Sequence, residues 1–155
     1  PGLWLFNALP DEDLMGFPPT PALTVDCVVF DPRGRVLLIR RGNEPFKGCY
    51  ALPGGFVDVG ETVEEACRRE LREETGLSVG DLLLVGVYSA PDRDPRGHTV
   101  STVFLAQLTK QANPAAGDDA ASAAWVDDWR AEHLAFDHAQ ILTDAEKFRS
   151  AIPQD

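Results

Sequence analysis

Residues 54–77 read GGFVDVGETVEEACRRELREETGL, which is a glycine-rich loop followed by a helical pattern. Apolar residues recur at spacings of three and four in the second part, and this periodicity predicts one buried stripe along a helix. The stripe consists of Val63, Ala66, Cys67 and Leu71. Gly76 suits the left-handed residue that often ends a helix, so we expect the helix to run from about Glu61 or Thr62 to Thr75.

The acidic residues of this helix are badly placed for a structural role alone. Glu70 and Glu74 are one turn apart on the same face, where like charges repel by roughly 0.2–0.5 kcal/mol per pair. Glu73 and Glu74 also fall in the last turn, where a carboxylate opposes the helix dipole by about 0.3–1 kcal/mol. Arg69 and Arg72 offset part of this cost, so a solvated face with ion pairs is one interpretation. The other is a set of hard oxygen ligands for Mg²⁺ or Mn²⁺, because a divalent cation would neutralise the repulsion.

The stretch resembles the signature of the Nudix hydrolases, G-x5-E-x7-R-E-[hydrophobic]-x-E-E-x-G-[hydrophobic]. Every fixed position is filled, by Gly55, Glu61, Arg69, Glu70, Leu71, Glu73, Glu74, Gly76 and Leu77. So many constraints over so short a span favour the metal site over the solvated face. The resemblance covers residues 21 to about 150. It implies an α/β/α sandwich with a mixed, mostly antiparallel sheet.

The resemblance also implies roles for single residues. The implied metal ligands are Glu70, Glu74, the backbone oxygen of Gly54 and, as an added ligand, Glu73. Mg²⁺ is the expected cofactor, and Mn²⁺ is an expected substitute. Arg69 is expected to orient Glu70 through a charge-assisted hydrogen bond, and Glu61 to fix the loop or to contact the metal through water. The general base stays open among Glu70, Glu73, Asp92, Asp94, Asp118 and Asp119.

The composition is consistent with one α+β domain. A chain of 155 residues with 44% hydrophobic content has room for a single core, and we expect it in residues 21–155, after an N-terminal arm of residues 1–20. The net charge of −11 argues against binding nucleic acid by neutralising its backbone. No apolar run approaches the roughly 20 residues of a membrane span, and the start of the sequence lacks the features of a signal peptide.

The cysteines and the arm suggest a compartment and an assembly. Three cysteines, Cys27, Cys49 and Cys67, without close pairing predict neither a disulfide framework nor a zinc motif, and they indicate a reducing cytoplasm. The arm carries Trp4, Phe6 and Phe17 among several prolines, which predicts an extended segment whose aromatic side chains cover another surface. That surface is either the core of the same chain or a partner subunit, and we favour a homodimer contact.

The other elements form two predicted hairpins, a short strand and a final helix. The first hairpin joins residues 23–30 and 35–41 around a turn, and the second joins residues 82–89 and 98–108. Trp125-Val126 is expected to end a short strand. Residues 137–151 have the apolar pattern of a helix, with Asp137 as its N-cap. This alternation indicates the α+β class.

Basic side chains outside residues 54–77 are candidates for binding substrate. The loop APDRDPRGH, residues 90–98, is either an exposed turn or a phosphate-binding loop, since arginine pairs bidentately with phosphate oxygens. In the second case Arg93, Arg96 and His98 contact a diphosphate or a ribose. Arg40 is a further candidate, although an arginine at a strand end is more often only solvated. The sequence LAFDH, residues 134–138, resembles a segment of the Nudix proteins that handle ADP-ribose, which implies a substrate contact for His138.

Residues 89–98 resemble the same group, and they favour one substrate. The expected reaction is Mg²⁺-dependent hydrolysis of ADP-ribose to AMP and ribose 5-phosphate, with a small-molecule nucleotide as the partner and no role for nucleic acid or membrane. Other Nudix substrates remain alternatives: an oxidised nucleoside triphosphate, a dinucleoside polyphosphate or NADH. A non-catalytic sensor of ADP-ribose is the alternative from a different class. Such sensors usually carry a degraded signature and an added DNA-binding domain, whereas the signature here is complete.

Overall fold

The computed structural model describes residues 16–117 and 120–153. The strands are β1 (Ala22–Phe30), β2 (Val36–Arg41), β3 (Tyr50–Ala51), β4 (Gly54–Phe56), β5 (Leu83–Tyr88), β6 (Thr99–Gln107) and β7 (Ala120–Val126). The helices are α2 (Val63–Thr75), the short 3₁₀ helix η2 (Trp129–Ala131) and α3 (His138–Ala151). Both predicted hairpins, the strand that ends at Val126 and the two predicted α-helices are therefore present.

The strands form one mixed sheet of seven strands in the order β3-β2-β1-β6-β5, with β4 paired to β1 and β7 paired to β2. Strands β1 and β6 are parallel, from Ala22 opposite Thr99 to Phe30 opposite Gln107. The other paired strands are antiparallel. The predicted mixed, mostly antiparallel sheet is confirmed.

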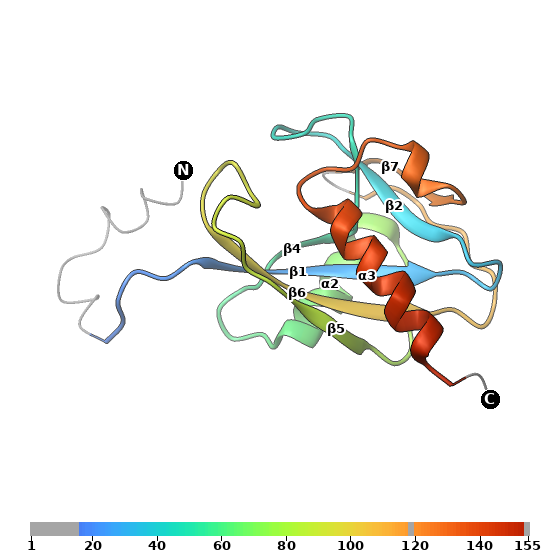
Figure 1. The fold of residues 1–155 in the computed structure, drawn as a ribbon, viewed down its shortest axis with the longest axis horizontal. Helices are drawn as coiled ribbons and strands as arrows, with labels where there is room; N and C mark the ends of the chain where they lie inside the picture. The colour runs from blue at the N-terminus through green and yellow to red at the C-terminus, as the bar shows by residue number, and fades with distance from the viewer. Residues whose placement is uncertain (1–15, 118–119, 154–155) are drawn as a thin grey trace.

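Alternate side chains of β1 point to opposite faces of the sheet. Val25, Cys27 and Val29 pack in one apolar cluster with the buried stripe of α2. Val28 and Phe30 pack in another cluster with the buried face of α3. Figure 1 shows α3 crossing one face of the sheet and α2 lying behind the other. The α/β/α sandwich is therefore confirmed, and it places the loop before α2 at the end of β1 where the chain enters the sheet.

The ends of α2 agree with the expected bounds. Thr62 is the N-cap, and it forms a capping box with Glu65 in which each side chain accepts a hydrogen bond from the other residue's backbone N–H. Gly76 ends the helix in the left-handed conformation with φ +72°. These local signals fix the position of the acidic face because they fix where the helix begins and ends.

Two expectations are corrected by the structure. Cys27 of β1 and Cys67 of α2 form a disulfide across a sequence separation of 40 residues, so the expectation that no disulfide is present was wrong. The pairing arises because the sheet and α2 bury both side chains against each other, which spacing along the chain does not reveal. Cysteine usage thus no longer argues for a reducing compartment. Asp137 precedes α3, but its side chain makes no capping hydrogen bond and pairs with Arg93 instead.

The N-terminal arm is described only from residue 16 onward, so Trp4 and Phe6 lie outside the described residues. Phe17 is 82% exposed. A contact between subunits therefore stays a prediction. Among the described residues, no helix is long and apolar enough to cross a membrane.

Candidate active site

One face of α2 is organised by the guanidinium of Arg69. It donates hydrogen bonds to both oxygens of Glu61 (3.0 and 2.5 Å), to Glu70 Oε1 (2.8 Å), to Glu73 Oε2 (3.2 Å) and to the carbonyl of Phe56 (3.0 Å). The bonds from Arg69 lower the pKa of Glu61 to about 2. Arg69 therefore joins the glycine-rich loop to the helix and holds three glutamates in fixed positions.

Glu70 and Glu74 lie beside the two glycines that open the loop. The amide of Gly54 donates to Glu74 Oε2 at 3.3 Å. The carboxylate of Glu70 lies against Gly55, where a β-carbon would come within 2.6 Å of Oε1. Burial, and then the charge of Glu70, raise the pKa of Glu74 to about 8. Burial also raises the pKa of Glu70. Without a cation, ionising the carboxylates of both Glu70 and Glu74 is therefore unfavourable.

This pair suits a divalent cation through the chemistry of its donors. Glu70 and Glu74 are hard oxygen donors on one helical turn. They lie next to Gly54 and Gly55, whose lack of a side chain leaves room for the two carboxylates. Glu73 faces Arg69 and its side chain is 49% exposed. In the described parts of the chain, no group of three or more His, Cys, Asp or Glu side chains is arranged around one ion position.

A loop covers the C-terminal end of α2 beside these glutamates. The amide of Ala115 donates to the Thr75 carbonyl (2.9 Å), and the amide of Gly117 donates to the Glu74 carbonyl (3.0 Å). These bonds satisfy carbonyl groups that a helix end leaves without partners. Asp118 and Asp119, two candidates for the general base, follow directly but lie outside the described residues.

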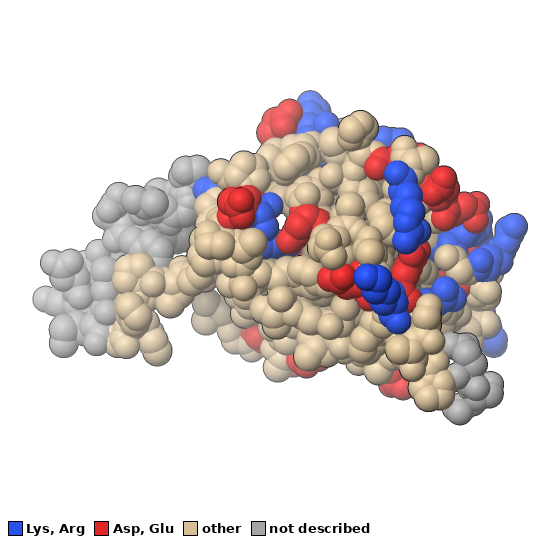
Figure 2. Space-filling model, in the orientation of Figure 1, with Lys and Arg blue, Asp and Glu red and all other residues tan. Residues whose placement is uncertain are grey.

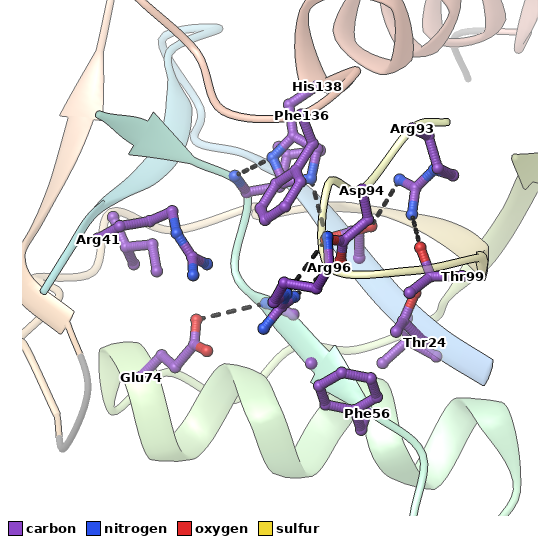
Figure 3. Close-up of a pocket in the computed structure, with 16 residues that line it drawn as sticks. Thr24, Arg41, Phe56, Glu74, Arg93, Asp94, Arg96, Thr99, Phe136 and His138 are labelled. Carbon is purple, nitrogen blue, oxygen red and sulfur yellow. Dashed lines mark hydrogen bonds and ion pairs between the residues drawn. The ribbon is translucent and has the colours of Figure 1, made fainter. Parts of the chain in front are cut away.

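Opposite Glu74, the pocket is lined by Arg41 and not by Arg40 (Figure 3). The Nη1 of Arg40 donates to the Gly48 carbonyl, and its guanidinium stacks on Tyr50 at 4.0 Å, outside the pocket lining. Arg41 donates through Nε to the Pro45 carbonyl and makes no ion pair within 4.0 Å with a described carboxylate. Burial, and then the positive charge of Arg96, lower the pKa of Arg41.

The loop of residues 90–98 contributes two arginines with different surroundings. Arg96 pairs with Asp94 at 2.8 Å and its side chain is 40% exposed. Arg93 is buried, donates two hydrogen bonds to Asp137 (2.9 and 2.7 Å) and one to Thr99 (2.8 Å). Arg96 is therefore accessible to a ligand, whereas most donors of Arg93 are already used inside the protein.

Beneath the pocket, a buried polar network connects β1, β6 and α3. Asp26 accepts a hydrogen bond from the Ser101 hydroxyl, and its Oδ1 lies 3.4 Å from Nε2 of His138. Nδ1 of His138 accepts from the Leu52 amide at 3.0 Å, which leaves Nε2 to carry the proton toward Asp26. Burial raises the pKa of Asp26 and lowers the pKa of His138. His138 lines the pocket from within this network.

The structure brings together some of the predicted residues and separates others. The pocket lining brings together Gly54, Gly55, Glu74, Arg93, Asp94, Arg96 and His138. Glu70 is not part of this lining, but its carboxylate lies against Gly55. His98 is exposed, and its Nε2 lies 3.0 Å from the Ser89 carbonyl, outside the lining. Asp92 borders a neighbouring cavity.

Sequence reasoning missed several residues that line the pocket, among them Asp26, Arg41 and Phe136. Asp26 is the charged residue in a mostly apolar strand, and that anomaly was a usable signal. Arg41 follows Arg40 directly, so the choice between them depended on which side of the strand end faces the pocket. Phe136 has a positive φ of 53°, which no local pattern indicates.

Comparison with known proteins now decides the family. A model of the NUDIX domain matches residues 20–145. The chain belongs to the Nudix family. It is 50% identical over 130 residues to an ADP-ribose pyrophosphatase of Methanocaldococcus jannaschii. The match covers 84% of this chain and 76% of that protein. It is also 35% identical over 134 residues to an ADPR responsive transcriptional repressor of Acinetobacter baylyi, covering 82% of this chain and 54% of the repressor.

Solved Nudix structures have the same fold. The NUDIX domain of NrtR from Shewanella oneidensis, solved with ADP ribose, superimposes with a TM-score of 0.79 at 30% identity and covers 90% of this chain and 98% of that domain. A bifunctional NMN adenylyltransferase/ADP ribose pyrophosphatase from Francisella tularensis, complexed with AMP and a manganese ion, gives 0.78 at 31% identity. That match covers 95% of this chain and 44% of the bifunctional protein.

Proposed function

We propose that this Nudix protein hydrolyses the diphosphate bond of ADP-ribose and releases AMP and ribose 5-phosphate, with Mg²⁺ as its cofactor and Mn²⁺ as a substitute. One arrangement supports the proposal above the rest. The Glu70–Glu74 pair lies against Gly54 and Gly55, and Arg41 and Arg96 line the same pocket as Glu74. Glu74, a proposed metal ligand, and two cationic side chains thus line one cavity.

In this proposal, some residues of α2 and the preceding loop bind the metal ion and others hold those ligands in position. Glu70, Glu74 and the backbone oxygen of Gly54 would hold the cation, with Glu73 as an added ligand. The cation would neutralise the diphosphate and lower the pKa of an attacking water. Arg69 holds Glu70 in position through a 2.8 Å hydrogen bond, and Glu61 holds Arg69.

Arg41 and Arg96 bind the phosphate oxygens in this proposal. Their guanidinium groups lie 5.0 and 5.8 Å from the centre of the same Phe136 ring, so they approach one region of the pocket. Two cations so placed repel each other until an anion lies between them. Burial, and then the charge of Arg96, lower the pKa of Arg41. A diphosphate satisfies both through charge-assisted hydrogen bonds. Arg93 and His138 act as positioning residues beneath the pocket.

The choice of ADP-ribose is supported by the relatives. The archaeal protein that is 50% identical to this chain is named an ADP-ribose pyrophosphatase, and the S. oneidensis domain was solved with ADP ribose. The A. baylyi relative, which is named an ADPR responsive transcriptional repressor, makes a non-catalytic sensor the competing proposal. The complete set of signature carboxylates favours the hydrolase, because binding alone does not need a cation-binding acidic face.

The decisive experiment measures AMP release from ADP-ribose with Mg²⁺, with Mn²⁺ and with excess chelator. A panel of other Nudix substrates, including NADH, a dinucleoside polyphosphate and an oxidised nucleoside triphosphate, provides the comparison. We expect ADP-ribose to give the highest kcat/KM and chelation to abolish turnover. Tight binding of ADP-ribose without hydrolysis would support the sensor, and turnover in excess chelator would contradict the metal mechanism.

We further propose that the protein forms a homodimer through its N-terminal arm. Phe17 is 82% exposed, so the described part of the arm leaves apolar surface uncovered, and the neighbouring Leu23 of β1 is 42% exposed. Light scattering coupled to size exclusion tests the assembly. A monomeric mass at micromolar concentration would contradict it.

A further inference from the structure

Two backbone hydrogen bonds join β3 to the segment that precedes α3. The Tyr50 amide donates to the His133 carbonyl at 3.1 Å, and the Ala135 amide donates to the Tyr50 carbonyl at 2.8 Å. These bonds form a parallel bridge between Tyr50 and Leu134. In a regular parallel ladder, the Leu52 amide would come next and would donate to the Ala135 carbonyl.

The ladder ends before this bond because the chain turns into α3. The His138 amide donates to the Ala135 carbonyl at 3.1 Å, and Phe136 between them has a positive φ of 53°. The Leu52 amide donates instead to Nδ1 of His138 at 3.0 Å (Figure 3). Leu52 and His138 are 2% and 3% exposed, so an unpaired amide at this point would be costly. The His138 side chain thus replaces a backbone acceptor where the ladder ends.

The second ring nitrogen of His138 selects the tautomer that this bond requires. Nε2 lies 3.4 Å from Asp26 Oδ1, and Asp26 Oδ2 accepts from the Ser101 hydroxyl at 2.5 Å. A carboxylate beside Nε2 favours the proton on that nitrogen and leaves Nδ1 able to accept. Burial lowers the pKa of His138, which favours the neutral ring. Asp26 therefore prepares His138 to accept from the Leu52 amide.

The residues that follow Leu52 lead directly to the proposed metal site. Gly54 lies opposite Asp26 in the register of β4 with β1, and a β-carbon on Gly54 would come within 2.6 Å of Asp26 Oδ1. The Gly54 amide donates to Glu74, and the Gly54 carbonyl is a ligand in the proposed function. Residues 52–54 are thus held at one end by His138 and at the other by Asp26, and these two side chains lie against each other.

We propose that His138 is a positioning residue for the metal site, because it fixes the backbone of residues 52–54 and with it the Gly54 carbonyl. Pro53 stiffens the connection, since its ring restricts φ between Leu52 and Gly54. Both ring nitrogens of His138 are used inside the protein, so this role differs from the substrate contact that the sequence LAFDH implies. The inference rests on the proposed function for the metal ligand at Gly54.

The test separates the two ring nitrogens with two variants. In His138→Asn the side-chain oxygen is bonded to Cγ, as Nδ1 is, so an acceptor for the Leu52 amide is kept. In His138→Gln the amide group lies one atom further out, near the place of Nε2, so that acceptor is lost and a donor toward Asp26 remains. His133→Gln is the matched control, because His133 is exposed and belongs to the same segment.

Three measurements are made on the metal-free protein and its variants. Titration with Mn²⁺ alone gives the Kd of the metal, and hydrogen exchange followed by NMR gives the protection of the Leu52 amide. Thermal unfolding confirms that each variant is folded. In the wild type, ¹⁵N NMR of the His138 ring reports the tautomer at neutral pH, and this measurement does not depend on any variant.

We expect His138→Gln to weaken Mn²⁺ binding by about 10–100-fold and to speed exchange of the Leu52 amide by about tenfold or more. His138→Asn and His133→Gln should stay within about threefold of the wild type in both measurements. The wild-type ring should carry its proton on Nε2.

A proton on Nδ1 in the wild type, or equal losses of Mn²⁺ affinity in folded His138→Gln and His138→Asn, would overturn the positioning role. Hydrolysis of ADP-ribose by a protein whose Mn²⁺ affinity is unchanged in His138→Gln would also overturn it and would leave the proposed function standing. Mn²⁺ binding that depends on His138 in a protein that leaves ADP-ribose intact would uphold the positioning role and refute the proposed hydrolysis.

Discussion

The carboxylate of Glu70 lies so close to Gly55 that a β-carbon on residue 55 would come within 2.6 Å of Oε1 and 2.9 Å of Oε2. A side chain at residue 55 would therefore displace the end of the Glu70 side chain. The contact places the Glu70 carboxylate beside Gly54 and Glu74, where the proposed cation binds.

Replacement of this glycine tests the contact. Gly55→Ala should displace the Glu70 carboxylate and lower both metal affinity and kcat by about 10–100-fold, the range seen when groups that orient metal ligands are lost. Metal titration and initial rates provide the measurement. Gly80→Ala is the matched control, because a β-carbon there meets nothing within 4 Å. Equal metal affinity in both variants would show that the contact does not position a ligand.

Glu74→Gln should lower turnover by orders of magnitude and leave the fold intact. The substitution keeps the shape of the side chain and its position near the Gly54 amide, but it removes an anionic ligand and the repulsion with Glu70. Rates at saturating Mg²⁺ and a thermal melt distinguish the two effects. Glu64→Gln, at an exposed position in the first turn of α2, should behave like the wild type. Wild-type turnover and metal affinity in Glu74→Gln would remove the ligand assignment.

The raised pKa of Glu74 predicts a pH dependence in the metal-free protein. Its value of about 8 in the folded state lies above the usual carboxyl value, so the folded protein binds more protons than the unfolded chain between these two values. The free energy of unfolding should therefore fall as pH rises toward 8, and Glu74→Gln should flatten the profile. Urea denaturation at a series of pH values, with chelator present, measures this. Stability that rises with pH over this window in the wild type, relative to the variant, would contradict it.

Metal binding should also release a proton near neutral pH, because the cation binds the ionised carboxylate. Below pH 8, apparent metal affinity is expected to rise by up to tenfold per pH unit and then level off. Calorimetry in buffers of different ionisation enthalpy counts the protons released. An affinity that is flat between pH 6 and roughly pH 8 would argue that Glu74 is already ionised or is not a ligand.

Arg41 and Arg40 provide a matched pair of adjacent residues. Arg41→Ala should lower kcat/KM for ADP-ribose by roughly 10–150-fold, the loss expected for hydrogen bonds to a charged group. Arg40→Ala should stay within about twofold, because the Arg40 guanidinium stacks on Tyr50 and bonds the Gly48 carbonyl outside the pocket. Steady-state kinetics on folded variants measure both. A larger loss for Arg40→Ala would reverse the assignment.

The Arg93–Asp137 pair should matter mainly for stability. Asp137→Ala leaves a guanidinium that is only 5% exposed without its bidentate partner, and breaking a buried pair in this way costs roughly 3–5 kcal/mol. Urea denaturation gives the change in the free energy of unfolding. Arg130→Ala removes the exposed pair with Glu146 and should cost about 1 kcal/mol or less. A similar loss of unfolding free energy in Asp137→Ala and Arg130→Ala would show that the buried ion pair stabilises the fold no more than the exposed one.

The surface fits a small anionic ligand better than a polyanion. Figure 2 shows acidic and basic side chains next to one another around a hollow on this face, without a continuous patch of one sign. The positive charges that line the pocket are local, and Asp26, Asp94 and Glu74 line the same pocket. Metal and arginine together are therefore needed to attract a diphosphate to a protein of net charge −11.

The sequence predicted those helices and strands whose formation depends on residues close together in the chain. Helix α2 follows from its apolar period, from the capping box that Thr62 begins and from the left-handed Gly76, all of which act within a few residues. The signature residues around it were also predictable, because their spacing on one helix sets which side chains share a face. The roles proposed for Glu70, Glu73 and Glu74 remain predictions.

Other features depended on contacts between distant segments. The Cys27–Cys67 disulfide, the use of Arg41 in place of Arg40, and the engagement of Asp137 by Arg93 all join residues that only packing of the sheet against its helices brings together. Periodicity records which face of an element is buried, but it does not record which element lies opposite. The sequence alone therefore established the helix, the strands and the acidic signature, whereas the tertiary structure decided which charged side chains face the pocket and which pair inside the protein.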